Sequence, residues 1–169
     1  QLLGFINQDT TIRDLRQRAY LLATVRHETA DTFAPIYERG SREYFNKYEP
    51  GTKLGRRLGN LERGDGYLFR GRGYVQITGR ANYARLSHPD YANRNLIANP
   101  DDALIASVAY RIMSCGMAYG LFTGAAIDRY IEEDQANYFN ARRVINGVDK
   151  ALLIAGYAKV MEDALRSAT

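Results

Sequence analysis

The sequence predicts an α+β fold that is mainly α, with a small lobe of loops and short strands inserted after the first long helix. Three observations predict it. Apolar residues recur at helical spacing near both ends of the chain, glycine and charge replace that periodicity over residues 31–73, and no internal repeat or linker interrupts the 169 residues. This length suffices for one core, so we expect a single domain over residues 1–169.

The first predicted helix spans residues 11–30. Thr11 and Asp14 have the spacing of an N-cap residue and its partner three positions later, a variant of the capping box. Apolar residues then recur at three- and four-residue steps and give the helix one apolar face: Ile12, Leu15, Ala19, Leu22 and Val25.

The inserted lobe has no helical periodicity. Its stretches "APIYERG" and "EYFNKYEPG" predict small strands or turns. The following "YVQI", residues 74–77, fits either a short strand or the entry to a helix over "ANYARLSH".

The second half of the chain is predicted to be helical again. Asn99 is placed as an N-cap and Pro100 at the first helical position, ahead of the nearly all-apolar "ALIASVAYRIMSCGMAYGL" of a buried central helix. Asp134 opens a further predicted helix that ends at Gly147, and Asp149 caps the last one.

Composition narrows the class of protein. Hydrophobic residues make up 46% and charged residues 25%, as in soluble globular proteins, and no apolar run approaches the roughly 20 residues of a membrane span. The N-terminal stretch lacks the charged and cleavable regions of a secretory signal, so we expect none. The chain does not begin with Met, so an upstream wall-binding module stays open as an alternative.

Charge and metal-binding residue types limit the partners. The net charge of +4 favours an anionic partner, for which nucleic acid and bacterial cell wall both qualify. The basic residues are scattered and form no recognition-helix pattern, which argues against nucleic acid. One cysteine, Cys115, excludes an internal disulfide, and two distant histidines give no zinc-ligand spacing.

Glu28 and Glu38 are the candidate catalytic carboxylates. Glu28 ends the first predicted helix next to His27, at the border of the lobe. A carboxyl group among apolar or aromatic neighbours can hold a proton near neutral pH, whereas one in polar surroundings stays ionised, and such a pair can hydrolyse a glycosidic bond. The alternative is structural: Glu28 is a surface residue, and Glu38 pairs with Arg39 or Arg42.

The segment of residues 71–83 offers polar groups suited to sugars. Its glycines form neither a dinucleotide loop nor a phosphate loop, because the third glycine of the first and the Gly-Lys-Ser/Thr of the second are missing. Gln76, Thr78 and Asn82 carry amide and hydroxyl groups that suit uncharged sugar hydroxyls and N-acetyl groups. Three tyrosines are candidates for stacking on sugar rings, with a place in the core as the alternative for the last two: Tyr67, Tyr74 and Tyr83.

These residues carry a resemblance to a known family. "RHET", followed by "GDGYLFRGRGYVQITGRANY" and later by "ARRVINGVDKALLIAGYAKVMEDAL", resembles glycoside hydrolase family 19, the chitinase-like group. Within that group the chain looks most like phage endolysins and related bacterial cell-wall lysozymes. The resemblance implies a lysozyme-like fold, with a substrate cleft between the helical core and the lobe, and one catalytic domain over residues 1–169.

The resemblance also implies catalytic roles. Glu28 in "HET" matches the general acid, and Thr78 matches the hydroxyl that helps to hold the attacking water. Glu38 is the first choice for the general base, with Glu43 and Glu49 as the alternatives. The family inverts the anomeric centre, which calls for carboxyl groups roughly 6.5–9.5 Å apart.

The remaining matches are to substrate-binding positions. Gln76, Asn82 and Asn146 match sugar-contacting amides, His27 matches a site-supporting histidine, and Tyr74 is our candidate for stacking. Val148 departs from the pattern, because many members have a second glycine after "NG".

The implied function is that of an endolysin. It would hydrolyse the β-1,4 bond between N-acetylmuramic acid and N-acetylglucosamine of peptidoglycan, as a monomer without metal or organic cofactor. It would stay in the host cytoplasm until released to the wall, or be carried in the virion. The alternatives are a chitinase and a non-catalytic glycan-binding module.

Overall fold

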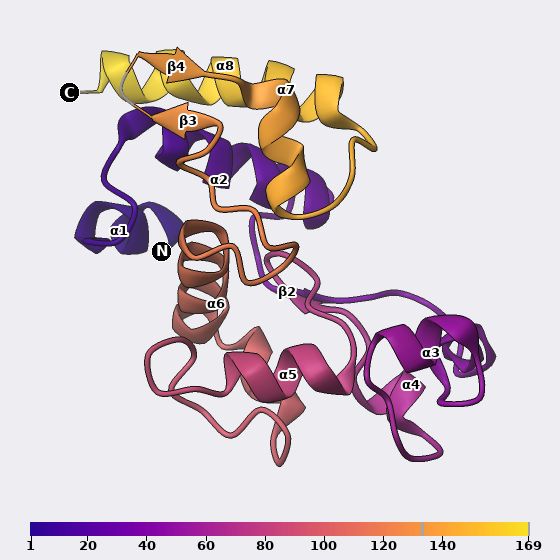
Figure 1. Ribbon diagram of the computed structural model, residues 1–169. Helices are drawn as coiled ribbons and strands as arrows, with labels where there is room; N and C mark the ends of the chain where they lie inside the picture. The colour runs from indigo at the N-terminus through magenta and orange to yellow at the C-terminus, as the bar shows by residue number, and fades with distance from the viewer. Residues whose placement is uncertain (133, 169) are drawn as a thin grey trace. The chain divides into compact units, whose positions relative to one another are not determined.

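Residues 1–33 and 113–169 fold together as one unit, and residues 34–112 fold as a second (Figure 1). The computed structural model describes residues 1–132 and 134–168. Helices dominate both units and the strands have two residues each, which confirms the prediction of a mainly helical α+β fold. The second unit begins within three residues of the predicted start of the lobe.

The first unit, unit 1, is helical apart from one small hairpin. Its strands β3 and β4 pair antiparallel, with Ile131 opposite Ala136 and Glu132 opposite Gln135. Its elements are α1 (Leu2–Gln8), α2 (Leu15–Glu28), β3 (Ile131–Glu132), β4 (Gln135–Ala136), α7 (Tyr138–Ala141), η3 (Arg142–Val144) and α8 (Ala151–Ser167). Helix α2 packs along α8, which also contacts α7, so α2 and α8 lie side by side in Figure 1.

Helix α2 begins later than predicted. Asp14 is its N-cap and accepts hydrogen bonds from the backbone N–H groups of Arg16 (2.7 Å) and Gln17 (3.3 Å). Thr11 is not the cap, because Asp9 accepts from the Thr11 N–H in a turn that precedes the helix. The predicted apolar face is buried except for Leu15, which is half-buried, and the helix ends at Glu28, two residues before its predicted end.

The C-terminal part of unit 1 corrects two predicted caps. Asn137, not Asp134, caps α7, and it accepts a hydrogen bond from the Asn140 N–H at 3.1 Å. Lys150, in the left-handed conformation, occupies the N-cap position of α8 that was predicted for Asp149. Both helices therefore begin within a few residues of where the sequence pattern placed them.

The second unit, unit 2, is built from short elements. Strands β1 and β2 pair antiparallel, with Ile36 opposite Gly73 and Tyr37 opposite Arg72. The stretch "EYFNKY" forms a 3₁₀ helix, not a strand, and "ANYARL" lies in a helix as predicted. The stretch "YVQI" is neither a strand nor the entry to that helix, because residues 74–76 form a turn and Ile77 forms an isolated bridge with Arg72. The elements are β1 (Ile36–Tyr37), η1 (Glu43–Tyr48), α3 (Lys53–Arg57), α4 (Asp65–Leu68), β2 (Arg72–Gly73), α5 (Arg80–Leu86) and η2 (Pro100–Leu104).

Helix α6 (Ala106–Ala118) is the predicted apolar helix. Most of its side chains are buried, including Cys115, and its residues are divided between the two units at Ile112 and Met113. Asn99 and Pro100 begin the short 3₁₀ helix η2 that precedes it, so the predicted single helix is two elements.

A buried ion pair holds the glycine-rich segment of unit 2 together. Asp65 is 2% exposed and pairs with Arg80 through two hydrogen bonds of 2.7 Å. The same carboxylate accepts from the backbone N–H groups of Leu61 and Glu62. Burial raises the pKa of Asp65, but these hydrogen bonds outweigh it, so its pKa lies below the ordinary value.

We expect Asp65→Asn to lower the free energy of unfolding by about 3 kcal/mol at pH 7, since it leaves the Arg80 guanidinium without its partner charge. A lowered pKa in the folded state stabilises the protein above the pKa of the unfolded state, and this stabilisation is lost as the pH falls through the folded-state pKa. The difference between wild type and Asp65→Asn should therefore shrink in acid. Urea unfolding from pH 7 to pH 3 measures it, and a difference that does not vary with pH would contradict the assignment.

Candidate functional site

Glu28 is held by an arginine that comes from the far end of the chain. Its Oε1 accepts a hydrogen bond of 2.7 Å from Nη1 of Arg142, in η3. The Arg142 side chain is 4% exposed and that of Glu28 is 17% exposed. The Nε of Arg142 donates to the backbone oxygen of Asp149, which fixes the guanidinium on its other side. Unit 1 thus presents a partly exposed carboxylate with a set orientation.

This surrounding differs from the apolar one that we expected for a proton-holding carboxyl group. A guanidinium forms an ion pair with Glu28. Arg142 was not among the predicted site residues, although it lies in the stretch "ARRVING" that carries part of the family resemblance. Its separation of 114 residues from Glu28 gave no local signal for the contact.

Glu38 lies in unit 2, one residue after β1, and its two oxygens meet different donors. Oε1 accepts from the hydroxyl of Tyr48 at 2.9 Å and lies 3.7 Å from Nζ of Lys47. Oε2 accepts from the backbone N–H of Gly71 at 3.1 Å. The Glu38 side chain is 19% exposed, so it is neither buried nor freely mobile in solvent.

The partners of Glu38 are not those of the structural alternative. Lys47, not Arg39 or Arg42, forms its ion pair. Burial, together with the Glu38 carboxylate, raises the pKa of Tyr48 to about 12, so Tyr48 stays a hydrogen-bond donor at neutral pH. Glu38 is therefore surrounded by donors, as an ionised carboxylate requires.

Glu43 and Glu49 have other surroundings. Glu43 is exposed, and hydrogen bonds from its own backbone N–H and from Ser41 lower its pKa. Glu49 accepts hydrogen bonds from the backbone N–H groups of Gly64 (2.8 Å) and Gly66 (3.2 Å), at the start of α4. Glu49 thus holds the start of α4 in place, whereas Glu43 is exposed.

Gly71 brings Glu38 and Gln76 together. A Cβ atom at Gly71 would lie 2.9 Å from Oε1 of Gln76 and 3.1 Å from Oε2 of Glu38. A side chain at position 71 would therefore have to displace the end of the Gln76 or Glu38 side chain. Gln76 has a positive φ of 53° and donates from Nε2 to the backbone oxygens of Ile36 and Gly73, both at 3.0 Å.

Thr78 and Asn82 continue from Gln76 as a chain of hydrogen bonds. The Thr78 hydroxyl donates to the Gln76 backbone oxygen at 3.0 Å, and Asn82 Nδ2 donates to the Thr78 backbone oxygen at 2.7 Å. All three side chains are half-buried. The polar residues predicted as sugar contacts are thus ordered by the local backbone before any ligand binds.

The remaining predicted substrate contacts differ from one another in their exposure. Tyr74 is 2% exposed, which leaves no ring face for a sugar and corrects its assignment as a stacking residue. Asn146 is exposed and accepts a hydrogen bond from the Gly147 N–H at 2.9 Å. His27 is half-buried on α2 next to Glu28, and its side chain makes no hydrogen bond or ion pair to the residues that the structure describes.

Arg72 explains why the glycine-rich motif carries so many polar and aromatic groups. Its guanidinium is buried and pairs with Asp101 at 2.8 Å, donates to the backbone oxygens of Leu68 and Arg70, and donates to the hydroxyl of Tyr83. Tyr83 is a core residue, as the alternative to its stacking role proposed. Part of the motif therefore builds the scaffold that positions the segment of residues 71–83.

The described residues restrict two further possibilities. No cluster of three or more His, Cys, Asp or Glu side chains among residues 1–132 and 134–168 is arranged to hold a metal ion. None of the helices over the same ranges combines the length and the apolar character of a membrane span.

A comparison with solved structures finds one known fold. A crystal structure of a chitinase C variant superposes with a TM-score of 0.50 and 21% sequence identity, covering 84% of this chain and 73% of the other. The fold is chitinase-like. No protein-family model matches the sequence, and no curated protein matches it. The chitinase-like fold agrees with the lysozyme-like type that the family resemblance implied.

Proposed function

We propose that this protein is an inverting glycoside hydrolase of the endolysin type. Its reaction is hydrolysis of the β-1,4 bond between N-acetylmuramic acid and N-acetylglucosamine in peptidoglycan. The observation that carries the proposal is the contrast between two held carboxylates on a chitinase-like fold: Glu28 contacts a single guanidinium, whereas Glu38 accepts from three kinds of donor.

Glu28 is the general acid. Arg142 occupies Oε1, and Oε2 accepts no hydrogen bond from the described residues, so Oε2 is available to carry the proton. As the glycosidic bond breaks, the proton passes from Oε2 to the leaving oxygen and Glu28 becomes negative. The Arg142 guanidinium stabilises that developing charge more than it stabilises the protonated acid, which is the differential binding that lowers a barrier.

Glu38 is the general base. An ionised carboxylate offers about four acceptor sites, and Tyr48, Gly71 and Lys47 leave room for a water molecule. Glu38 removes a proton from this water while the oxygen of the water bonds to the anomeric carbon, on the face opposite the leaving group. Thr78, held by Gln76, is the hydroxyl that helps to position the water.

The distribution of charge favours peptidoglycan over neutral chitin. Residues 34–112 contain 13 Lys and Arg against 8 Asp and Glu, whereas the rest of the chain has 10 against 11. The positive charge is thus concentrated in the unit that carries the proposed base, where it attracts a polyanionic wall. We propose that the enzyme acts on the wall as a monomer, after release from the host cytoplasm or from the virion.

A chitinase is the second candidate, because the solved structure with a similar fold is a chitinase C variant. Turnover of purified peptidoglycan and of chitin oligomers, measured side by side, distinguishes the two. We expect muropeptides with reducing muramic-acid ends from peptidoglycan, at a rate at least about tenfold above that on chitin. Release from chitin while peptidoglycan stays intact would assign the enzyme to chitin.

A further inference from the structure

Unit 2 contains a pocket of about 460 Å³, beside the helix that holds Glu38. This volume lies in the range of small-ligand sites. The 3₁₀ helix η1 contributes to both places, since Lys47 and Tyr48 contact Glu38 while Glu43 and Asn46 line the pocket. At about 2 Å per residue, Glu43 and Tyr48 are about 10 Å apart along this helix.

Two arginine side chains that line this pocket can interact with a negatively charged ligand. Within the described part of the chain, the side chains of Arg42 and Arg63 form no hydrogen bond and no ion pair. Arg42 lies over the ring of Tyr67, 5.0 Å from its centre, which orients its guanidinium while the side chain stays exposed. A planar guanidinium pairs best with a carboxylate, which it can bind through two hydrogen bonds.

The pocket also offers a place for a cation. Glu49 is occupied by the backbone N–H groups of Gly64 and Gly66, whereas Glu43 is exposed and interacts with its own N–H, with Ser41 and with the charge of Arg42. Asn46 adds an amide that can donate or accept. The pocket therefore presents exposed charged side chains of both signs, Arg42 and Arg63 being positive and Glu43 negative.

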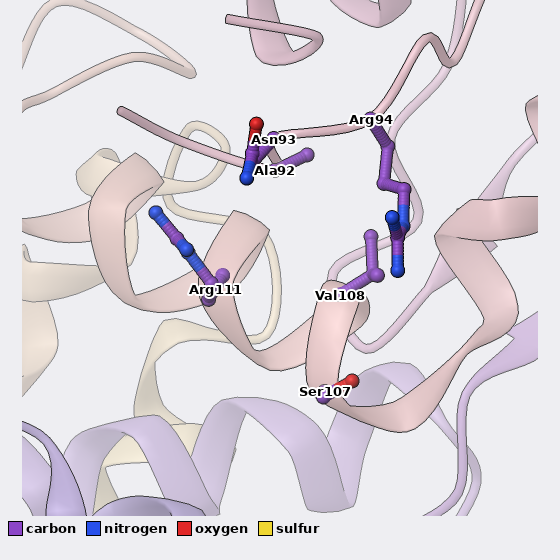
Figure 2. A pocket seen from close by; sticks show the side chains of 6 residues that line it. All are labelled: Ala92, Asn93, Arg94, Ser107, Val108 and Arg111. Atoms are coloured by element: carbon purple, nitrogen blue, oxygen red, sulfur yellow. The ribbon is translucent and has the colours of Figure 1, made fainter. Parts of the chain in front are cut away.

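A second pocket in the same unit differs in size and chemistry. It measures about 190 Å³, and Figure 2 shows Arg94 and Arg111 at opposite ends of it, with no acidic side chain among its lining residues. Arg111 already donates to the backbone oxygens of Pro89 and Asp90. This pocket lacks a carboxylate for an ammonium group, which makes it a useful control.

From these observations we propose that the larger pocket binds the peptide stem of peptidoglycan, through an amino-acid group that carries both a carboxylate and an ammonium. Arg42 and Arg63 bind the carboxylate, and Glu43 binds the ammonium. The inference rests on the proposed function and deepens it, because chitin has no such group. The glycan strand bound at Glu38 and the peptide stem bound in this pocket would then belong to the same substrate.

The test is a binding titration with the full chain and a sugar-free probe, N-acetyl-L-alanyl-γ-D-glutamyl-meso-diaminopimelate, followed by calorimetry or by NMR. Its one ammonium belongs to the diamino acid. We expect the wild type to bind the probe. The double variant with Arg63→Gln and Arg42→Gln should bind it at least about tenfold more weakly, which is the scale of a charge-assisted hydrogen bond. Arg63→Gln alone, at an exposed side chain, should weaken binding in the same direction with the fold intact.

Two controls decide the assignment. Arg94→Gln, at an exposed arginine in the smaller pocket, changes the net charge by the same amount as Arg63→Gln alone and should leave binding of the probe unchanged. Acetylation of the probe's ammonium should weaken its binding to wild type. Absence of binding to wild type, an equal loss in Arg94→Gln, or equal affinity for the acetylated probe would each overturn the inference. Because no bond is cleaved, these results are independent of whether the chain hydrolyses glycan.

Discussion

Glu28→Gln should reduce release of muropeptides from peptidoglycan by at least about a hundredfold, the scale of general acid catalysis. The amide keeps the shape of the side chain and can still accept from Arg142, but it has no proton to give to the leaving oxygen. Mass spectrometry of timed digests measures the loss. Substrate binding should change little, whereas the thermal unfolding midpoint should fall, because the amide leaves the buried Arg142 guanidinium without its partner charge.

The matched control for this experiment is Glu132→Gln, an exposed residue of β3 in the same unit. It changes the net charge equally and should keep wild-type activity. A Glu28→Gln variant that retains more than about a tenth of wild-type turnover would remove Glu28 from the role of acid. Wild-type products cut at the amide bond to the peptide stem would show that the scissile bond is misassigned.

Glu38→Gln should have the second large effect, a loss of at least about a hundredfold in kcat. The amide can accept from Tyr48 but cannot take a proton from water, so the attacking water is no longer activated. The first product released by wild type should carry the inverted anomeric configuration, which proton NMR can detect before the sugar equilibrates. Retention of configuration would contradict the role of Glu38 as a base that acts through water.

The other acidic residues of η1 and its surroundings make this prediction specific. Glu62→Gln, at an exposed side chain, should leave kcat unchanged. Glu49→Gln should lower the thermal midpoint, because Glu49 holds the start of α4. Glu43→Gln should raise KM, because Glu43 lines the larger pocket, which we propose binds the peptide stem. A hundredfold loss of kcat in Glu43→Gln or Glu49→Gln, with Glu38→Gln active, would transfer the role of base.

The site combines predicted and unpredicted residues. Glu28, Glu38, Gln76, Thr78 and Asn82 were proposed from the sequence, and the structure shows all of them at least partly exposed and with ordered side chains. Their catalytic and sugar-binding roles stay predictions. The supporting residues were missed, since their positions along the chain say nothing about which carboxylate each one contacts.

The predicted stacking role of Tyr74 is wrong, because the sequence pattern does not show which way a side chain faces. A tyrosine in a glycine-rich segment has the same sequence pattern whether its ring faces a ligand or the interior, and only packing distinguishes the two. The ring of Tyr74 is buried, as is that of Tyr83, whose hydroxyl also meets the guanidinium of Arg72.

From the sequence alone follow the mainly helical class, the places of the long helices and the start of the inserted lobe, because caps and apolar spacing act between residues a few positions apart. The second unit extends to Ile112, well beyond the predicted end of the lobe at residue 73. Only the tertiary structure decided that Arg142 pairs with Glu28 across 114 residues, that Tyr48 and Lys47 hold Glu38, and that Tyr74 is buried. These contacts depend on how distant segments pack, and the energy of packing is shared among residues that no local pattern links.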